Sequence, residues 1–227
     1  MAIICRSYNL LFIMTPRTAC TAVGEVLCKH LGGEYLPQED IVDSEGFFVV
    51  QKKHSKLKEL LDNKLLSPEE VSSLKIFTTI RNPFDSLVSL YVKKRDKYYP
   101  LLSDPESWVY RVPNYVEDIK FCRNHSFNTL IYKSYGRHLI KFILGHGRTS
   151  IFDEFTQSAN EIIRFENLRS DFQGILDMAG IQKKLTIPRV NITANRATDY
   201  RPYYSKLSRM MVEFILQNDL RKYEYRF

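Results

Sequence analysis

Apolar residues along this chain gather in short runs that alternate with stretches of helical spacing. Four of the runs have the length and composition of strands: residues 8–14, 47–51, 75–80 and 161–165. Between the first two, residues 18–31 carry Val23, Val26 and Leu27 at helical spacing, and Gly32-Gly33 follows as a helix end. This alternation predicts an α/β fold with a central parallel sheet flanked by helices.

Capping residues and apolar stripes predict further helices. Ser67-Pro68-Glu69-Glu70 is a capping box with proline at the first helical position. Asn82 caps a helix with one apolar face, made of Phe84, Leu87, Val88 and Tyr91. Residues 170–179 form a helix that Gly180 closes. A last helix over residues 205–216 is expected to bury Leu207, Met210, Met211 and Phe214.

The composition describes a globular protein with a basic surplus. At 227 residues and 44% hydrophobic content, the chain is expected to form a single domain over residues 1–227. The net charge of +7 fits an anionic ligand, a nucleic acid or an acidic polymer, and selects none of them. The apolar run at residues 10–14 is too short to span a bilayer, and no secretory signal is evident.

The four cysteines have neither metal-ligand spacing nor the density of a disulfide framework; they are Cys5, Cys20, Cys28 and Cys122. Reduced thiols are therefore expected, which favours a cytoplasmic location. Cys20 could have a lowered pKa beside Arg17. The simpler interpretation is a small residue that fits a tight turn.

The junction at residues 10–21, LLFIMTPRTACT, carries the clearest chemical signal. An apolar strand ends in a tight loop, and a helix then begins. Free amide groups and the positive end of the helix dipole make such a junction a binding site for phosphate-like anions. Arg17 supplies a fixed cation where a Walker loop has lysine. The loop contains no glycine, so it does not match the Walker pattern.

Two further polar segments follow predicted strands. Lys52-Lys53-His54 comes after the strand at residues 47–51, and residues 81–89, RNPFDSLVS, come after the strand at residues 75–80. In an open α/β sheet the ligand crevice lies at the carboxyl ends of the strands. Arg81 and Ser89 can both hold a phosphate there, although Arg81 taken alone could be a surface arginine that pairs with Asp85. In an extended segment Lys52 and His54 would point to the same side, away from Lys53.

These segments together resemble those of sulfotransferases that use 3′-phosphoadenosine 5′-phosphosulfate (PAPS). Residues 15–21, TPRTACT, resemble the family's 5′-phosphosulfate loop, and residues 81–89 resemble its 3′-phosphate motif. Lys52-Lys53-His54 resembles the Lys-x-His of cytosolic members, whose histidine is the general base. Residues 164–168 resemble a segment that begins a family helix, and residues 191–227 resemble carbohydrate sulfotransferase C-termini.

The resemblance implies the P-loop NTPase-like sulfotransferase fold, with PAPS as sulfuryl donor, 3′,5′-adenosine bisphosphate (PAP) as product and no metal. The catalytic residues it implies are His54 as base, Arg17 and Lys52. The cofactor-binding residues are Pro16, Arg17, Thr18, Ala19, Cys20, Thr21, Ala22, Arg81, Ser89 and Arg196. The chain departs from the family at Arg17, where lysine is common. It also lacks the C-terminal Arg-Lys-Gly motif, and the loop with Asn191, Asn195 and Arg196 is the candidate replacement.

Several alternatives stay open at this point. Glu166 follows a predicted strand and could be a second base, although a structural role beside the next helix is favoured. The acceptor is a carbohydrate or a small molecule, and the aromatic residues 98–115, with Trp108, either line its pocket or form core. A P-loop kinase would need a Walker lysine and an acidic magnesium ligand, but the strand at 75–80 ends in Arg81. A basic nucleic-acid-binding module is the third class, and no nucleic-acid partner or membrane span is expected.

Overall fold

A computed structural model describes residues 2–143, 150–190, 193 and 196–227, without the side chains of residues 137–143. The chain forms two compact units, each built from two separate stretches of sequence. The first unit contains Met1–Arg81 and Phe152–Ile192, and the second contains Asn82–Ile151 and Thr193–Phe227. The boundary between the units therefore falls inside the predicted 3′-phosphate motif, directly after Arg81.

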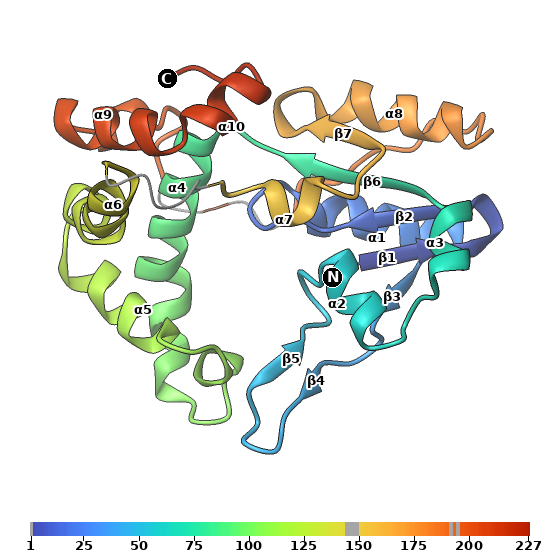
Figure 1. The fold of residues 1–227 in the computed structure, drawn as a ribbon, viewed down its shortest axis with the longest axis horizontal. Coiled ribbons are helices and arrows are strands. Elements are labelled where there is room, and N and C mark those ends of the chain that lie inside the picture. Colours follow the sequence, from blue (N-terminus) through green and yellow to red (C-terminus); the bar gives the residue numbers. More distant parts are fainter. Residues whose placement is uncertain (1, 144–149, 191–192, 194–195) are drawn as a thin grey trace. The chain divides into compact units, whose positions relative to one another are not determined.

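The first unit is built on a five-stranded sheet with the order β3-β1-β2-β6-β7 (Figure 1). Its strands are β1 (Ala2–Cys5), β2 (Leu10–Ile13), β3 (Glu34–Leu36), β6 (Lys75–Ile80) and β7 (Glu161–Arg164). The strands β2, β6 and β7 run parallel, as predicted, but β1 is antiparallel to both of its neighbours. A sheet of mostly parallel strands flanked by helices confirms the predicted fold class.

The strand β1 was not predicted from the sequence, and it makes the sheet mixed. A short 3-10 turn, η1 (Arg6–Tyr8), and the left-handed residue Asn9 join it to β2. So short a connection can join only antiparallel strands, because a parallel pair needs a long crossover. The predicted strand at residues 8–14 therefore begins later, at Leu10.

Helices cover both faces of this sheet, so β2 is buried on both sides. On one face α1 (Cys20–Leu31) and α8 (Leu168–Met178) pack against Leu10, Phe12 and Phe77. On the other face α2 (Leu57–Asp62), with Val71 of α3 (Pro68–Ser73), packs against Leu11, Ile13 and Ile76. The alternation of apolar side chains between these two clusters fixes the register of β2 against β6. A short helix, α7 (Asp153–Thr156), precedes β7.

The predicted strand at residues 47–51 forms, but it lies outside the central sheet. It is β5 (Phe48–Val50), and it pairs with β4 (Ile41–Val42) in a separate antiparallel hairpin. The segment that follows β5 is a turn, and His54 has a positive φ of 71°. The expectation of an extended segment at Lys52-Lys53-His54 is therefore wrong, and its argument for placing Lys52 and His54 on one side no longer applies.

The second unit is helical. It contains α4 (Pro83–Val92), the π-helix η2 (Lys93–Tyr98), η3 (Tyr99–Ser103), η4 (Trp108–Arg111), α5 (Tyr115–Asn124), α6 (Phe127–Ile143), η6 (Arg201–Tyr203), α9 (Lys206–Ile215) and α10 (Gln217–Lys222). Asn82 caps α4 as predicted, because its side chain accepts the amide hydrogen of Phe84. The predicted apolar face of α4 packs against α6 and α9 in the core of this unit.

The helix α9 buries a different face from the one that its sequence pattern predicts. Leu207, Met210 and Phe214 are 57%, 53% and 42% exposed, and Met211 is half-buried. The buried residues are instead Ser208, Val212 and Ile215. Ser208 donates a hydrogen bond to the side chain of Asn128 in α6, so the face of α9 that meets α6 contains a polar contact that an apolar stripe does not predict. The apolar residues of α9 therefore extend around more of the helix than the face that packs against α6, and some of them stay exposed.

Candidate active site

The loop after β2 has the backbone geometry of an anion cradle. Arg17 and Ala19 have positive φ angles of 70° and 61°, and Thr18 between them does not. Where the sign of φ alternates along consecutive residues, as it does over Arg17, Thr18 and Ala19, successive N–H groups can point toward one anion, and we refer to these three residues as the nest. Ala19 is also the N-cap residue of α1, so the positive end of the helix dipole lies at the same loop. The helix begins two residues later than the sequence predicts, at Cys20.

The predicted ligands in this loop divide into buried and accessible side chains. Thr18, Cys20 and Ala22 are buried, whereas Pro16, Arg17, Ala19 and Thr21 are half-buried. Any role of the three buried residues in anion binding is therefore limited to their backbone amides. The buried position of Cys20 in the core agrees with its interpretation as a small residue in a tight turn.

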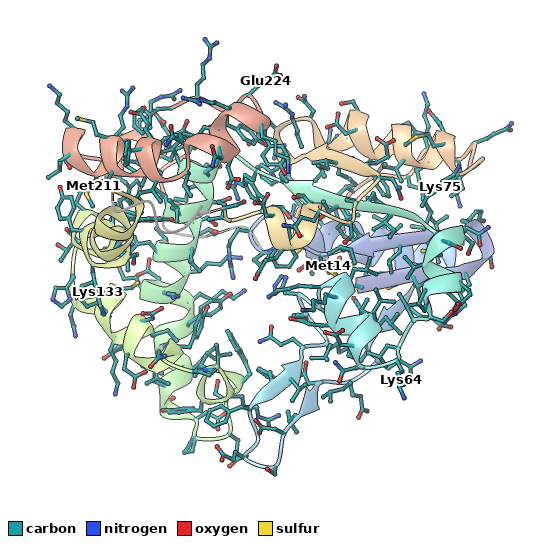
Figure 2. All side chains as sticks on the ribbon, viewed as in Figure 1. Met14, Lys64, Lys75, Lys133, Met211 and Glu224 are labelled. Carbon is teal, nitrogen blue, oxygen red and sulfur yellow. The ribbon has the colours of Figure 1, made fainter. Side chains whose placement is uncertain are left out.

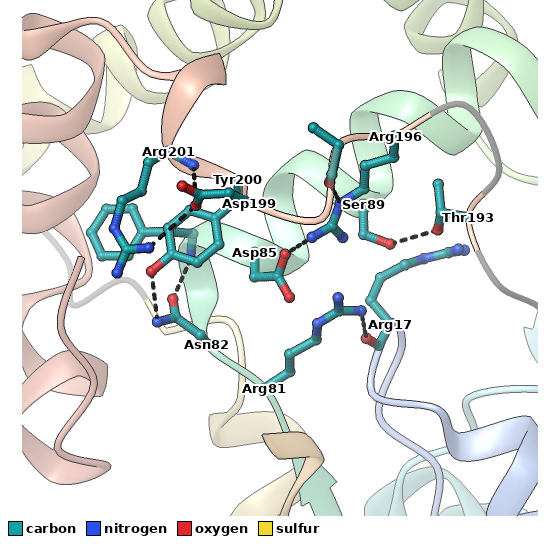
Figure 3. A network of polar contacts seen from close by, with 12 residues as sticks. Arg17, Arg81, Asn82, Asp85, Ser89, Thr193, Arg196, Asp199, Tyr200 and Arg201 are labelled. Carbon is teal, nitrogen blue, oxygen red and sulfur yellow. Dashed lines mark hydrogen bonds and ion pairs between the residues drawn. The ribbon is translucent and has the colours of Figure 1, made fainter. Parts of the chain in front are cut away.

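Arg81 lies where the ends of three neighbouring strands meet. It follows β6, and its Nη1 donates a hydrogen bond to the carbonyl oxygen of Arg17 at 3.1 Å (Figure 3). Its guanidinium carbon lies 4.1 Å from the ring centroid of Phe165, the first residue after β7. Stacking on an aromatic ring fixes the plane of a guanidinium. Phe165 was expected only as the end of a strand, and the sequence carries no signal that pairs it with Arg81.

His54 reaches this region by a different route from the one predicted. Its Nδ1 lies 2.8 Å from the carbonyl oxygen of Met14, the residue directly after β2, whose side chain is labelled in Figure 2. The buried hydroxyl of Ser55 holds the segment in place: it donates to the carbonyl of Leu36 and accepts the amide hydrogen of Ala2. His54 is thus tied to β1, β2 and β3 through main-chain contacts, although β5 is not part of their sheet.

The environment of His54 keeps its imidazole neutral. Burial lowers its pKa from 6.5 to about 3, and the positive charges of Arg17 and Lys53 act in the same direction. A carbonyl oxygen only accepts hydrogen bonds, so Nδ1 carries the ring proton. Nε2 therefore keeps its lone pair, as a general base requires.

Lys52 is engaged at both its backbone and its side chain. Its amide donates to the carboxylate of Asp40 at 2.5 Å, and its ammonium lies 5.3 Å from the ring centroid of Tyr35 in β3. The catalytic role predicted for Lys52 therefore depends on the family motif alone. Glu166, the alternative base, is exposed in the short 3-10 turn η5 (Phe165–Asn167).

The remaining predicted cofactor residues belong to the second unit. Arg196 forms an ion pair with Asp85, and their side chains are only 9% and 14% exposed. Asp85, the alternative partner considered for Arg81, thus pairs with Arg196. The hydroxyl of Ser89 lies 3.1 Å from that of Thr193 (Figure 3). Asn191 and Asn195, the other candidates in this loop, lie outside the described residues.

The groups present in the first unit fit a phosphate-like anion. They are the amides of the nest, the guanidinium of Arg17 and that of Arg81. Across the part of the chain that the structure describes, no group of three or more His, Cys, Asp and Glu side chains could hold a metal ion. None of the described helices is long and apolar enough to cross a membrane.

Comparison with known proteins identifies the family. The model of the sulfotransferase family matches residues 1–226, so the chain belongs to this family of sulfuryl-transfer enzymes. No curated protein matches the chain. Among solved structures it is similar to mouse sulfotransferase SULT7A1 complexed with PAP, with 14% identity, 95% of this chain and 86% of that chain covered, and a TM-score of 0.42. Family membership decides against the kinase and the nucleic-acid-binding module as the function of this chain.

Proposed function

We propose that the protein transfers the sulfuryl group of PAPS to a hydroxyl of a carbohydrate or a small-molecule acceptor. The observation that carries the proposal is the contact between Arg81 and the backbone of Arg17. It joins the two segments that resemble the phosphate motifs of PAPS enzymes. The nest carries the guanidinium of Arg17, and the guanidinium of Arg81 is hydrogen-bonded to its backbone. Two cations and several backbone amides suit a ligand with more than one phosphate group.

In this proposal the residues of the anion loop, which we define as Thr15–Thr21 after β2, bind the 5′ end of the cofactor. The nest amides and Arg17 hold the phosphate that bears the sulfuryl group, and Arg81 binds the 3′-phosphate. Ser89 and Arg196 are proposed as cofactor ligands from the family motif and its tail. PAPS supplies an activated sulfuryl group, and the protein supplies positive charge where the leaving phosphate oxygen becomes negative.

His54 is proposed as the general base. Its Nε2 would take the proton of the acceptor hydroxyl as the new O–S bond forms and the bond from sulfur to the phosphate oxygen breaks. A pKa of about 3 makes the free imidazole a weak base. Bound phosphate groups would raise this pKa, because nearby negative charge stabilises the imidazolium. The base would therefore gain strength when the cofactor is bound.

We propose that no metal takes part, because the guanidinium groups of Arg17 and Arg81 and the backbone amides of the nest would supply the positive charge that the phosphate groups need. The cytoplasmic location also remains a proposal. It rests on the four cysteines, all of which are free thiols. Burial raises the pKa of Cys5 to about 12 and that of Cys122 to about 11, which keeps both protonated.

Radiolabelled sulfuryl transfer tests the proposal directly. The purified protein is incubated with ³⁵S-PAPS and two acceptor panels, one of saccharides and one of phenols and alcohols, with and without EDTA. We expect labelled product in one panel, with EDTA causing no loss. In parallel, PAP should raise the melting temperature without magnesium, whereas ATP should not. Stabilisation by ATP and magnesium alone would contradict the choice of donor.

A further inference from the structure

A buried chain of hydroxyl groups fixes the loop on one side of β6. The hydroxyl of Thr78 donates to the carbonyl oxygen of Ile13 at 2.7 Å, so it can only accept from a second partner. That partner is Thr15, whose Oγ1 lies 2.8 Å away. Thr15 is therefore the donor in this pair. Both side chains are buried, so the bond replaces one that water would otherwise make.

A second chain of hydroxyl groups starts from the next residue of β6. The hydroxyl of Thr18 donates to the carbonyl oxygen of Thr15 at 2.8 Å. The Thr18 hydroxyl has only one hydrogen, so in its short hydrogen bond with the hydroxyl of Thr79 it is the acceptor. Thr79 is the donor, and both side chains are fully buried. Because each chain contains a carbonyl oxygen that can only accept, the donor and the acceptor of every hydroxyl–hydroxyl bond are determined.

The two chains hold the loop from opposite faces of the sheet. Thr78 and Thr79 are neighbours in a strand, so their side chains point to opposite sides. Phe77, two residues before Thr79, belongs to the core cluster that contains α1. Ile76, two residues before Thr78, belongs to the cluster on the other face. The loop therefore crosses the carboxyl edge of β6 between Thr15 and Thr18.

The bond from Thr79 lies at the point where the loop backbone is strained. Thr18 stands between Arg17 and Ala19, which are both left-handed without being glycine. Such a conformation costs about 1–2 kcal/mol per residue and persists only where the surroundings enforce it. The bond to Thr79 fixes the side chain of the one residue between these two, and Arg81 fixes the carbonyl of Arg17.

We propose that Thr79 is a positioning residue for Arg17, acting through the hydroxyl of Thr18. It sets the nest and the Arg17 guanidinium in the geometry that sulfuryl transfer needs, without touching the ligand. The effect on turnover rests on the proposed function of Arg17. The effect on loop geometry does not depend on that function, and the two can be measured separately.

The test compares Thr79→Val, which keeps the shape and removes the hydroxyl, with Thr79→Ser, which keeps the hydroxyl. Thr156→Val is the matched control, because Thr156 is also buried in the first unit and its hydroxyl donates to the carbonyl of Phe152, at the start of its own helix α7. The first readout is hydrogen exchange of the amides of residues 17–20. We expect faster exchange in Thr79→Val, and wild-type rates in Thr79→Ser and in the control.

The second readout is steady-state kinetics with PAPS. Thr79→Val should lower kcat by about ten- to a hundredfold, with a smaller change in PAP affinity. A misplaced catalytic group reduces the stabilisation of the transition state more than it reduces binding in the ground state. Thr79→Ser should restore most of the rate. In an Arg17→Ala background, Thr79→Val should cause little further loss, because the residue it positions is already absent.

Wild-type exchange rates in Thr79→Val would overturn the proposal, whether or not the protein transfers sulfuryl groups. An equal additional loss of kcat in the Arg17→Ala background would also overturn it, since Thr79 would then act elsewhere. If neither the wild type nor any variant transfers a sulfuryl group, the proposed function is wrong. The role of Thr79 in the geometry of the loop is then decided by the hydrogen-exchange measurement alone. Should Thr79→Val not fold, Thr79→Cys, with its weak S–H donor, takes its place in both readouts.

Discussion

The guanidinium of Arg81 donates a hydrogen bond to the main-chain carbonyl of Arg17 at 3.1 Å. The side chain of one phosphate-binding segment thereby holds the backbone of the other, although 64 positions separate the two residues in sequence. A change at Arg81 should therefore affect the anion loop as well as any ligand that Arg81 binds itself.

Replacement of Arg81 should weaken cofactor binding. We expect Arg81→Ala to reduce the affinity for PAP by roughly 2–4 kcal/mol, because a charged contact with a phosphate is lost and the loop loses one anchor. Isothermal titration calorimetry measures the change. Arg6→Ala is the control, since Arg6 is an exposed arginine that pairs with Glu70. Unchanged affinity in Arg81→Ala would remove Arg81 from the site.

Phe165 should support binding only through its aromatic ring. Phe165→Leu keeps an apolar side chain but loses the stacking on Arg81, so PAP affinity should fall by about 0.5–1 kcal/mol. Phe165→Tyr keeps the ring and should bind as the wild type does. In an Arg81→Ala background the difference between these two variants should vanish. A difference that survives there would mean that Phe165 acts independently of Arg81.

Arg17 should act on the transition state more than on the ground state. Negative charge on the leaving phosphate oxygen develops only during transfer, so Arg17→Ala should lower kcat by about a hundredfold or more. The loss of PAP affinity should be smaller. Steady-state kinetics and calorimetry on the same preparation separate the two effects. A variant that turns over at a near-normal rate would contradict the assignment.

His54 should be required for transfer and dispensable for cofactor binding. His54→Ala should leave PAP affinity almost intact and reduce kcat at least a hundredfold. Because burial lowers the pKa of the imidazole in the free enzyme, the acid limb of kcat/KM for PAPS should lie well below pH 6.5 and should disappear in the variant. Full activity in His54→Ala, together with loss of activity in Glu166→Gln, would identify Glu166 as the base instead.

His54 should also make stability depend on pH. Its pKa is 6.5 in the unfolded chain and about 3 in the folded protein, so the unfolded state binds more protons between these values. The free energy of unfolding should therefore fall as the pH drops below 6.5, by up to about 1.4 kcal/mol per pH unit. Urea unfolding at pH 7 and pH 5 measures this slope. His54→Gln should flatten it, whereas a change at the exposed His30 should not.

Local patterns in the sequence predicted those parts of the fold that depend on neighbouring residues. The bounds of β6 are those predicted, and Asn82 caps α4 as predicted, because strand length and capping are decided within a few residues. The anion loop was also predicted, since a strand that ends in a polar turn and a helix start form one continuous segment. The left-handed backbone of Arg17 and Ala19 was not predicted, because the loop contains no glycine, the residue that usually indicates this conformation.

Tertiary structure decided what depends on contacts between distant segments. The sequence placed His54 at a strand of the central sheet, whereas its position comes from a bond to Met14 and from the anchor at Ser55. The stacking of Phe165 on Arg81 and the choice of buried face on α9 likewise depend on partners far along the chain. A sequence pattern records the preference of one segment. The sequence of one segment is compatible with several packing partners, because the burial of apolar surface is non-directional. Only the packing of the whole chain into one core decides which of these partners the segment contacts.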